Sequence, residues 1–237
     1  MGSIFKFKSF EVDQEDCAMK INTDGVLLGA IVETDSPKRI LDVGTGTGVI
    51  ALMLAQRFSD AKVDAVEIDE LASKRAAYNF NNSLFSDRLN VFHSSFDEIK
   101  SANRYDLIVS NPPFYTNSLH NPDDRKKLAR HTDIDFFKSL IDFSIDNLGI
   151  HGQLTLIVPL DLSNEIIALT NNSDLNLVSH IDIRSFSDKE IIRRIISFKK
   201  LSTRNTNLRK DEFIIYEEKG VYSSQYKSIL KPFFLAF

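Results

Sequence analysis

The chain has 237 residues, of which 43% are hydrophobic, and this suits one large globular domain with a sizeable core. Its net charge is −4 and its apolar runs fall well short of the roughly 20 residues that span a bilayer, so we expect a cytoplasmic protein with no membrane segment. The single cysteine, Cys17, excludes an intrachain disulfide, and five scattered histidines lack metal-ligand spacing, so we expect no metal.

The first half of the chain alternates short apolar runs with amphipathic segments. Apolar and polar residues alternate imperfectly over 4–12, as they do in an edge strand or a hairpin arm. A helix capped by Thr23 is expected next. Helices are also expected directly after Gly48 and over 70–82. Buried strands are predicted at 38–43, 62–66, 89–92 and 105–109. Strands that alternate with helices in this way indicate a parallel sheet.

The second half begins with a polar stretch that ends at Thr132, which we interpret as a substrate-facing loop. Asp133 is then expected to cap a helix over 134–148 that ends at Gly149 or Gly152. The remaining predicted elements are a strand at 154–158, a helix near 162–169, β-structure at 175–198 with a bulge, β-structure at 212–216, and a closing helix and tail over 226–234.

Three glycines, Gly44, Gly46 and Gly48, lie in the first strand-to-helix turn. Glycine permits unusual backbone angles and lets a ligand approach the main chain. Glu67 follows Gly48 by about nineteen residues, at the tip of the next strand, where a carboxylate accepts hydrogen bonds from a ribose. This arrangement predicts a nucleotide or nucleoside site.

Asp42, just before the glycines, favours one ligand over another. A carboxylate there repels a diphosphate but complements the ammonium and sulfonium groups of S-adenosylmethionine. The loop also lacks the lysine of a P-loop. We therefore expect a methyl donor, with a dinucleotide or a ligand-free structural fold as the alternatives.

A stiff turn follows the apolar run 107–109 and reads Ser110-Asn111-Pro112-Pro113-Phe114. The two prolines have fixed φ angles and no backbone N–H, so the turn offers mainly acceptors. The Asn111 side-chain oxygen and the Pro112 carbonyl suit the two hydrogens of a planar exocyclic amine, and Phe114 suits stacking on its ring. The alternative is a turn that merely ends a strand.

Basic residues are concentrated between Arg184 and Lys210, where nine basic side chains meet two acidic ones. This segment carries +7, and the rest of the chain carries −11. A basic band on an acidic protein is compatible with a nucleic-acid backbone. The alternative is a pair of solvated strands that balance an acidic surface.

The motifs DVGTGTG at 42–48, EID at 67–69 and NPPF at 111–114 resemble, in this order, class I S-adenosylmethionine-dependent methyltransferases that act on amines. The run CAMKINTDGVLLGA at 17–30, with ARHT at 129–132, resembles the bacterial tRNA1(Val) (adenine-37-N6)-methyltransferase family. The resemblance implies N6-methylation of the adenine 3′ of a valine anticodon, with tRNA as partner and S-adenosyl-L-methionine as cofactor.

The same resemblance implies the fold: a single α/β, Rossmann-like domain over 1–237. It comprises an N-terminal strand and helix extension (1–35), a core (36–200) and a C-terminal strand and helix (201–237). The core holds a mostly parallel, twisted, seven-stranded sheet with helices on both faces. We expect a monomer or weak dimer.

Individual roles also follow from the resemblance. Catalytic contacts are expected from Asn111, Pro112 and Phe114. Cofactor contacts are expected from Lys20, Thr23, Asp42, Gly44, Thr45, Gly46, Gly48, Glu67, Ile68, Ser95, Phe96 and Asn111. RNA contacts are expected from Pro113, Lys126, Lys127, Arg130, Arg184, Arg193 and Arg194. Where many relatives carry an acid in the third cofactor motif, this chain has SSFD at 94–97, so either Ser95 or Asp97 would bind the adenine amine.

Other substrates remain open from the sequence. The same Asn-Pro-Pro-aromatic turn serves enzymes that methylate a release-factor glutamine, a ribosomal RNA guanine or a DNA adenine. A non-enzymatic RNA-binding scaffold is a further alternative, but it would leave Asp42, Glu67 and Asn111 without a purpose.

Overall fold

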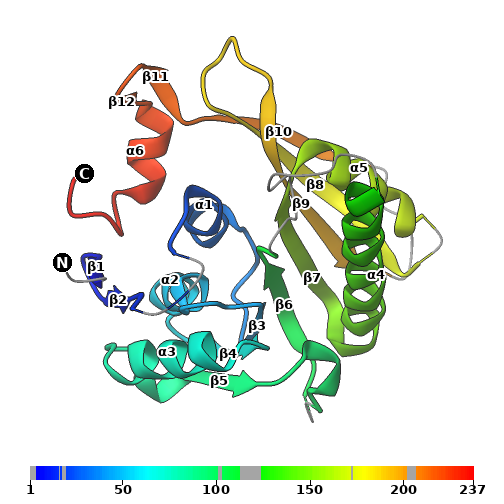
Figure 1. Cartoon of the computed structure of the whole chain (residues 1–237), viewed down its shortest axis with the longest axis horizontal. Helices are drawn as coiled ribbons and strands as arrows, with labels where there is room; N and C mark the ends of the chain where they lie inside the picture. The colour runs from blue at the N-terminus through cyan, green and yellow to red at the C-terminus, as the bar shows by residue number, and fades with distance from the viewer. Residues whose placement is uncertain are drawn as a thin grey trace.

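The computed structural model describes residues 4–15, 17, 20–100, 103–112, 124–171, 173–201 and 207–237, with the side chains of 124–133 excepted. Eight strands form one twisted sheet in the order β10-β8-β9-β7-β6-β3-β4-β5 (Figure 1). Their bounds are β3 Arg39–Val43, β4 Lys62–Glu67, β5 Leu89–His93, β6 Tyr105–Ser110, β7 Leu148–Val158, β8 Leu175–Arg184, β9 Ile191–Lys200 and β10 Arg209–Ile214.

The sheet is mostly parallel, as the sequence predicted. Strands β5, β4, β3, β6 and β7 pair in parallel, whereas β9 is antiparallel to both β7 and β8. β10 pairs in parallel with β8 at the edge, so the predicted count of seven strands was wrong by one. The register of β8 against β9 shifts twice, which places the expected bulge.

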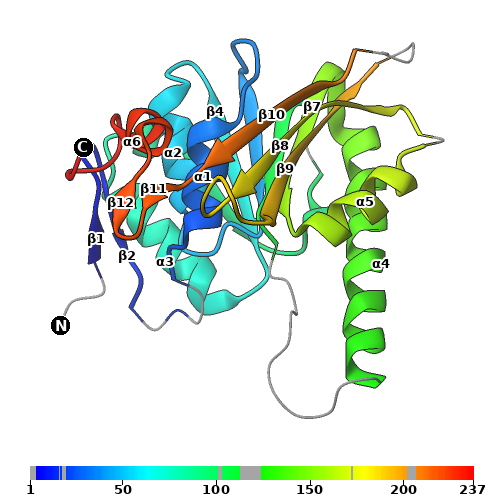
Figure 2. The same cartoon turned by 90° about the horizontal axis from the view of Figure 1, so that it is seen from above.

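Helices cover both faces of the sheet (Figures 1 and 2). One face carries α1 (Thr23–Ile31), α2 (Val49–Arg57), α3 (Glu70–Asn81) and α6 (Ser224–Leu230), and the other carries α4 (Asp124–Asn147) and α5 (Leu160–Leu169). Because side chains alternate along a strand, β6 serves both cores: Leu107 and Val109 join the first cluster, and Ile108 joins the second. This burial on both faces explains the continuous apolar runs of the central strands.

The shorter elements lie at the margins of the sheet. They are the antiparallel pair β1 (Ile4–Lys6) and β2 (Glu11–Asp13), the antiparallel pair β11 (Tyr216–Glu218) and β12 (Val221–Tyr222), and the 3-10 helices η1 (Ser86–Arg88) and η2 (Phe96–Glu98). The N-terminal hairpin packs against the C-terminal tail. Phe7 bridges to Phe234, and the Lys8 backbone N–H donates to the Phe233 carbonyl at 2.8 Å.

Three local predictions were wrong. Asn22, not Thr23, caps α1, because its side chain accepts from the Gly25 N–H. α4 begins at Asp124, so Asp133 does not cap it and residues 124–132 are helical; residues 113–123 lie outside the described part. β7 begins at Leu148, directly after the helix, so both predicted terminators, Gly149 and Gly152, lie inside a strand.

Candidate functional site

Strand register brings the three predicted motifs together. β3 lies between β4 and β6, with Val43 opposite both Val66 and Ser110. The residues that follow are Gly44, Glu67 and Asn111, so they begin three neighbouring turns at the carboxyl edge of the sheet. The chain runs outward from β3 to β5 and then returns to β6 on the other side, and ligands of open α/β sheets bind at such a reversal.

The backbone amides of the glycine turn are already engaged within the protein. Gly44 and Thr45 donate to the Val66 carbonyl at 2.9 and 3.1 Å, and Gly48 donates to the Thr45 carbonyl at 2.9 Å. Gly46 donates to Glu67 Oε2 at 2.8 Å. A diphosphate is held by free N–H groups, so this turn is a poor dinucleotide cradle.

The three glycines differ in what their missing β-carbon permits. Gly44 and Gly46 have φ of +72° and +57°, and a β-carbon on either would meet nothing within 4 Å. They therefore border open space on the ligand side of the turn. Gly48 has φ of +88°, and its β-carbon would lie 2.4 Å from Phe80 Cε1. Gly48 thus lets α3 pack closely, a role separate from the predicted cofactor contact.

Two carboxylates give the turn its negative character. Asp42 is fully buried and accepts from Thr45 Oγ1 at 2.6 Å. Burial raises the pKa of Asp42 to about 7; hydrogen bonds from Thr45 and from the Ala51 backbone oppose this rise, and the charge of Glu67 adds to it. Within the described chain neither carboxylate has a Lys or Arg partner, so the pair suits a cationic ligand with ribose hydroxyls.

Asn79 supports the turn from α3, and the sequence analysis missed it. Its side chain is buried and donates to the Thr47 carbonyl at 2.8 Å and to the Asp13 carbonyl at 3.0 Å. The Asp13 N–H donates back to Asn79 Oδ1 at 2.9 Å. An asparagine on an amphipathic helix gives no local signal of this role, because its partners come from two distant segments.

The turn that the sequence predicts to bind an amine lies beside the start of α1. Asn111 is partly exposed, Pro112 is buried, and Pro113 and Phe114 lie outside the described residues. Asn111 Nδ2 donates to Asn22 Oδ1 at 3.4 Å, a contact that the sequence did not predict. Ser110 fixes the preceding position, since its Oγ donates to the Val43 carbonyl at 2.8 Å.

The remaining predicted cofactor residues differ in their surroundings. Ile68 follows Glu67 and is 74% exposed, which leaves an apolar surface for a flat ring to cover. In the third motif Ser95 is partly exposed, whereas the Phe96 ring is buried against Phe136 and Phe143. Phe96 therefore has only its backbone to offer a cofactor. The other predicted positions, Asp97, Lys20 and Thr23, are exposed.

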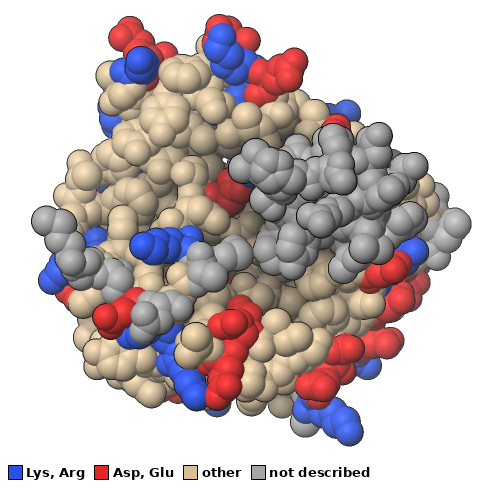
Figure 3. Space-filling view, viewed as in Figure 1, with Lys and Arg blue, Asp and Glu red and all other residues tan. Residues whose placement is uncertain are grey.

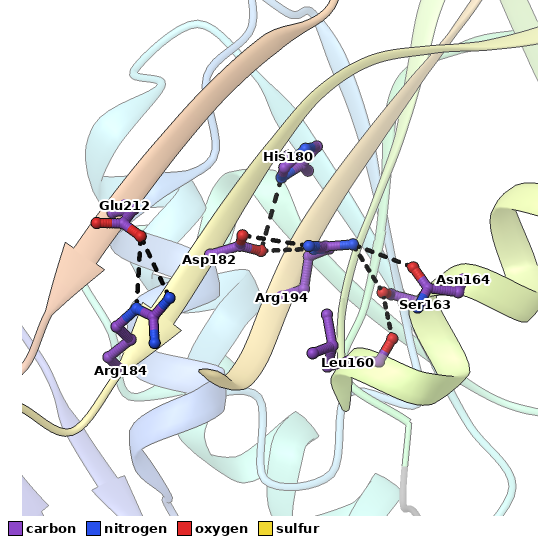
Figure 4. A network of polar contacts seen from close by, with 8 residues as sticks. All are labelled: Leu160, Ser163, Asn164, His180, Asp182, Arg184, Arg194 and Glu212. Carbon is purple, nitrogen blue, oxygen red and sulfur yellow. Dashed lines mark hydrogen bonds and ion pairs between the residues drawn. The ribbon is translucent and has the colours of Figure 1, made fainter. Parts of the chain in front are cut away.

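The predicted RNA-binding arginines of β8 and β9 are engaged in ion pairs, and Figure 4 shows those of Arg184 and Arg194. Arg194 is largely buried and donates to both carboxylate oxygens of Asp182 at 2.5 and 3.1 Å. Arg184 lies 3.4 Å from Glu212, and Arg193 lies 2.7 Å from Asp24 at the start of α1. Their charges thus act within the fold, a possibility that charge counting could not exclude.

His180 belongs to the same network. Its Nδ1 lies 3.6 Å from Asp182, and burial followed by the charge of Arg194 lowers the pKa of the imidazole (Figure 4). Arg194 also reaches Asn164 on α5 at 3.2 Å, so the network ties that helix to the sheet. We therefore assign Arg194 a structural role.

The surface around the site is electrostatically mixed. On the face in Figure 3, the described Lys and Arg side chains are scattered among acidic ones and form no single basic patch. Lys126, Lys127 and Arg130 lie on the first part of α4, where only the backbone is described. Among the described side chains no cluster of three potential metal ligands occurs, and no described helix is long and apolar enough to cross a bilayer.

Comparison with known proteins agrees with this geometry. The family model described as methyltransferase small domain matches residues 17–167. The crystal structure of a predicted O-methyltransferase from Agrobacterium tumefaciens aligns with a TM-score of 0.68 at 20% identity, over 89% of this chain and 96% of that one. A methyltransferase from Pyrococcus furiosus aligns with a TM-score of 0.57 at 22% identity, over 80% and 89%. These likenesses confirm the fold.

Two curated relatives identify the family more narrowly, and both are named tRNA1(Val) (adenine(37)-N6)-methyltransferase. The protein from Pedobacter heparinus is 46% identical over all of both chains. The protein from Flavobacterium psychrophilum is 39% identical over 98% of this chain and 99% of its own. Full-length similarity at this level, together with a methyltransferase fold and a site suited to a cationic nucleoside, places the chain in the tRNA1(Val) (adenine(37)-N6)-methyltransferase family.

Proposed function

We propose that this protein transfers a methyl group from S-adenosylmethionine to the N6 amine of adenine 37, beside the anticodon of a valine tRNA. The observation that carries the proposal is the row formed by Gly44, Glu67 and Asn111 at the reversal of the sheet. It joins a turn suited to a cationic nucleoside with a turn suited to a planar amine. The names of the full-length relatives supply the substrate.

The described residues fit the cofactor at several points. The open faces of Gly44 and Gly46 would admit it, the buried carboxyl of Asp42 would place negative potential beneath its positive charge, and Glu67 would accept from its ribose hydroxyls with the lone pairs that the Gly46 N–H leaves free. Ile68 offers apolar surface to the adenine. When bound, S-adenosylmethionine supplies an electrophilic methyl carbon. A cation beside Asp42 would lower the pKa of this carboxyl and keep it ionised.

Asn111 and Pro112 would activate the target amine. The lone pair of an aromatic amine is delocalised into its ring, so the amine is a weak nucleophile. The Asn111 side-chain oxygen and the Pro112 carbonyl would each accept one N–H, which directs the lone pair toward the methyl carbon. No strong base is needed, since the amine becomes acidic only after methylation; positioning and electrostatics supply the acceleration.

Adenine 37 must leave its stack to enter this turn, and unstacking costs less in an anticodon loop than in a duplex. We propose that Lys126, Lys127 and Arg130 hold the RNA backbone and that Pro113 and Phe114 contact the base. Arg193 of β9 can contribute near the site because its partner, Asp24, lies at the start of α1. Arg194 is held instead by Asp182 of the neighbouring strand β8. We further propose that the protein acts in the cytoplasm as a monomer or weak dimer.

Transfer of labelled methyl groups tests the proposal directly. The protein is incubated with labelled S-adenosylmethionine and, in parallel, with valine tRNA, ribosomal RNA, release factor or DNA. Mass spectrometry of nuclease fragments should then find N6-methyladenine at position 37 of the tRNA alone. Asn111→Ala should lower turnover at least 100-fold while cofactor affinity is kept. Labelling of another substrate only would overturn the assignment of valine tRNA as substrate. Undiminished turnover by Asn111→Ala would overturn the proposed role of Asn111.

A further inference from the structure

We propose that Asn22 is a positioning residue that fixes which way the Asn111 amide faces; this inference rests on the proposed role of Asn111. The two ends of a side-chain amide have nearly the same shape but opposite hydrogen-bonding character. Only the oxygen of Asn111 can accept from a target amine. If the amide is rotated by half a turn, an NH2 group meets an NH2 group and the complex is unproductive.

The orientation follows from a chain of hydrogen bonds that begins at an unambiguous donor. The Gly25 backbone N–H can only donate, and it donates to the Asn22 side chain at 2.8 Å. The Asn22 atom at this point must therefore be its oxygen, Oδ1. The Asn111 atom that lies 3.4 Å from the same oxygen must then be a donor, Nδ2. The Asn111 oxygen is thereby turned away from α1.

The Asn22 side-chain oxygen, which links the two hydrogen bonds, is held in place by the start of α1. Asn22 is the N-cap of α1, whose residues from Gly25 to Ile31 are all buried. Arg193 of β9 anchors the same helix start through Asp24 at 2.7 Å. A methyl group on Gly25 would lie 3.4 Å from Asn111 Nδ2 and 3.5 Å from Asn22 Oδ1, which shows how closely the two turns approach.

The length of the contact limits its effect. At 3.4 Å it is longer than the usual 2.9–3.0 Å for N–H···O, so it contributes more to orientation than to stability. Catalytic hydrogen bonds are often long in free enzymes and tighten when substrate binds. Loss of one such bond corresponds to a roughly threefold to tenfold loss of rate. We expect this loss in the methyl-transfer step and not in cofactor affinity.

Two substitutions at position 22 separate orientation from capping. Asn22→Gly removes the acceptor but keeps an adequate cap, because glycine is itself a favoured N-cap residue, so the fold should remain stable. Asn22→Asp keeps both the cap and an acceptor that cannot donate. Single-turnover methylation of valine tRNA should fall roughly threefold to tenfold for Asn22→Gly, and Asn22→Asp should restore most of it. Cofactor affinity by calorimetry should match wild type in both.

Two controls make the outcome decisive. Ser223→Gly removes the N-cap of α6, a helix outside the three motif turns, and should leave the rate per folded enzyme unchanged. In an Asn111→Ala background, Asn22→Gly should cause no further loss, because no amide remains to orient. An undiminished rate for Asn22→Gly, or equal losses for both substitutions at position 22, overturns the inference. Undiminished turnover by Asn111→Ala overturns instead the proposed role of Asn111.

Discussion

Gly48→Ala should destabilise the protein far more than the same change at the other glycines of the turn. At φ of +88° a β-carbon brings a backbone strain of about 1–2 kcal/mol. It would also lie 2.4 Å from Phe80, inside the ordinary contact distance, and overpacking of this kind costs about 1–3 kcal/mol. The sum is about 2–5 kcal/mol. For a chain of this size it lowers Tm by roughly 4–20 °C.

Gly46→Ala and Gly220→Ala are matched controls. Both glycines have positive φ, and a β-carbon on either meets nothing within 4 Å, so only strain applies. We expect each to lower Tm by roughly 2–8 °C in thermal unfolding followed by circular dichroism. Gly46→Ala should also weaken cofactor binding, and Gly220→Ala should not.

A double substitution isolates the clash itself. Phe80→Leu trims the ring that the new β-carbon at position 48 would meet, so the double variant should be more stable than the sum of the two single changes implies. If Gly48→Ala loses no more Tm than the two controls, or if the effects of Gly48→Ala and Phe80→Leu simply add, the packing argument is wrong.

Two further predictions concern buried charge. Asp42 ionises near pH 7 when folded and near 3.8 when unfolded, so it contributes stability at low pH that is lost as pH rises through this window. The free energy of unfolding of Asp42→Asn, measured in urea without cofactor, should therefore rise relative to that of the wild type by on the order of 4 kcal/mol between about pH 4 and 7. A difference that stays constant with pH would contradict this. Arg194→Met should lower the free energy of unfolding by about 3–5 kcal/mol, because it leaves the largely buried Asp182 without its arginine and with only His180 nearby, and a second substitution, Asp182→Leu, should recover most of that loss. Weakened tRNA binding with unchanged Tm would instead assign Arg194 to the RNA surface.

The parts of the fold that the sequence predicted are those with local signals. The runs before Gly44, Glu67 and Asn111 are buried on both faces, so they are mainly apolar without a clear alternation and indicate parallel strands. Because each of the three motifs directly follows a predicted parallel strand, the sequence also placed them together at the carboxyl edge of the sheet. The start of α4 escaped prediction because its first residues are polar and show no apolar period.

Other features depend on partners that are distant in sequence. Asn22 and Thr23 are both good helix caps, and only the contact of Asn22 with Gly25 decides between them. The basic band suggested free charge, yet Arg193 pairs with Asp24, which is 169 residues away. No count of charges within one segment contains such a partner, so the ion pairs could not be predicted; the RNA contacts of these arginines stay a prediction.

The contact between the N-terminal hairpin and the C-terminal tail sets an order for folding during synthesis. A chain leaves the ribosome from its N-terminus, and domains usually fold as they emerge. Here Phe7 and Lys8 find their neighbours only after Phe233 and Phe234 have been made. The hairpin can therefore complete this packing only after residues 233 and 234 have left the ribosome. A circular permutant that fuses these two segments would remove that delay.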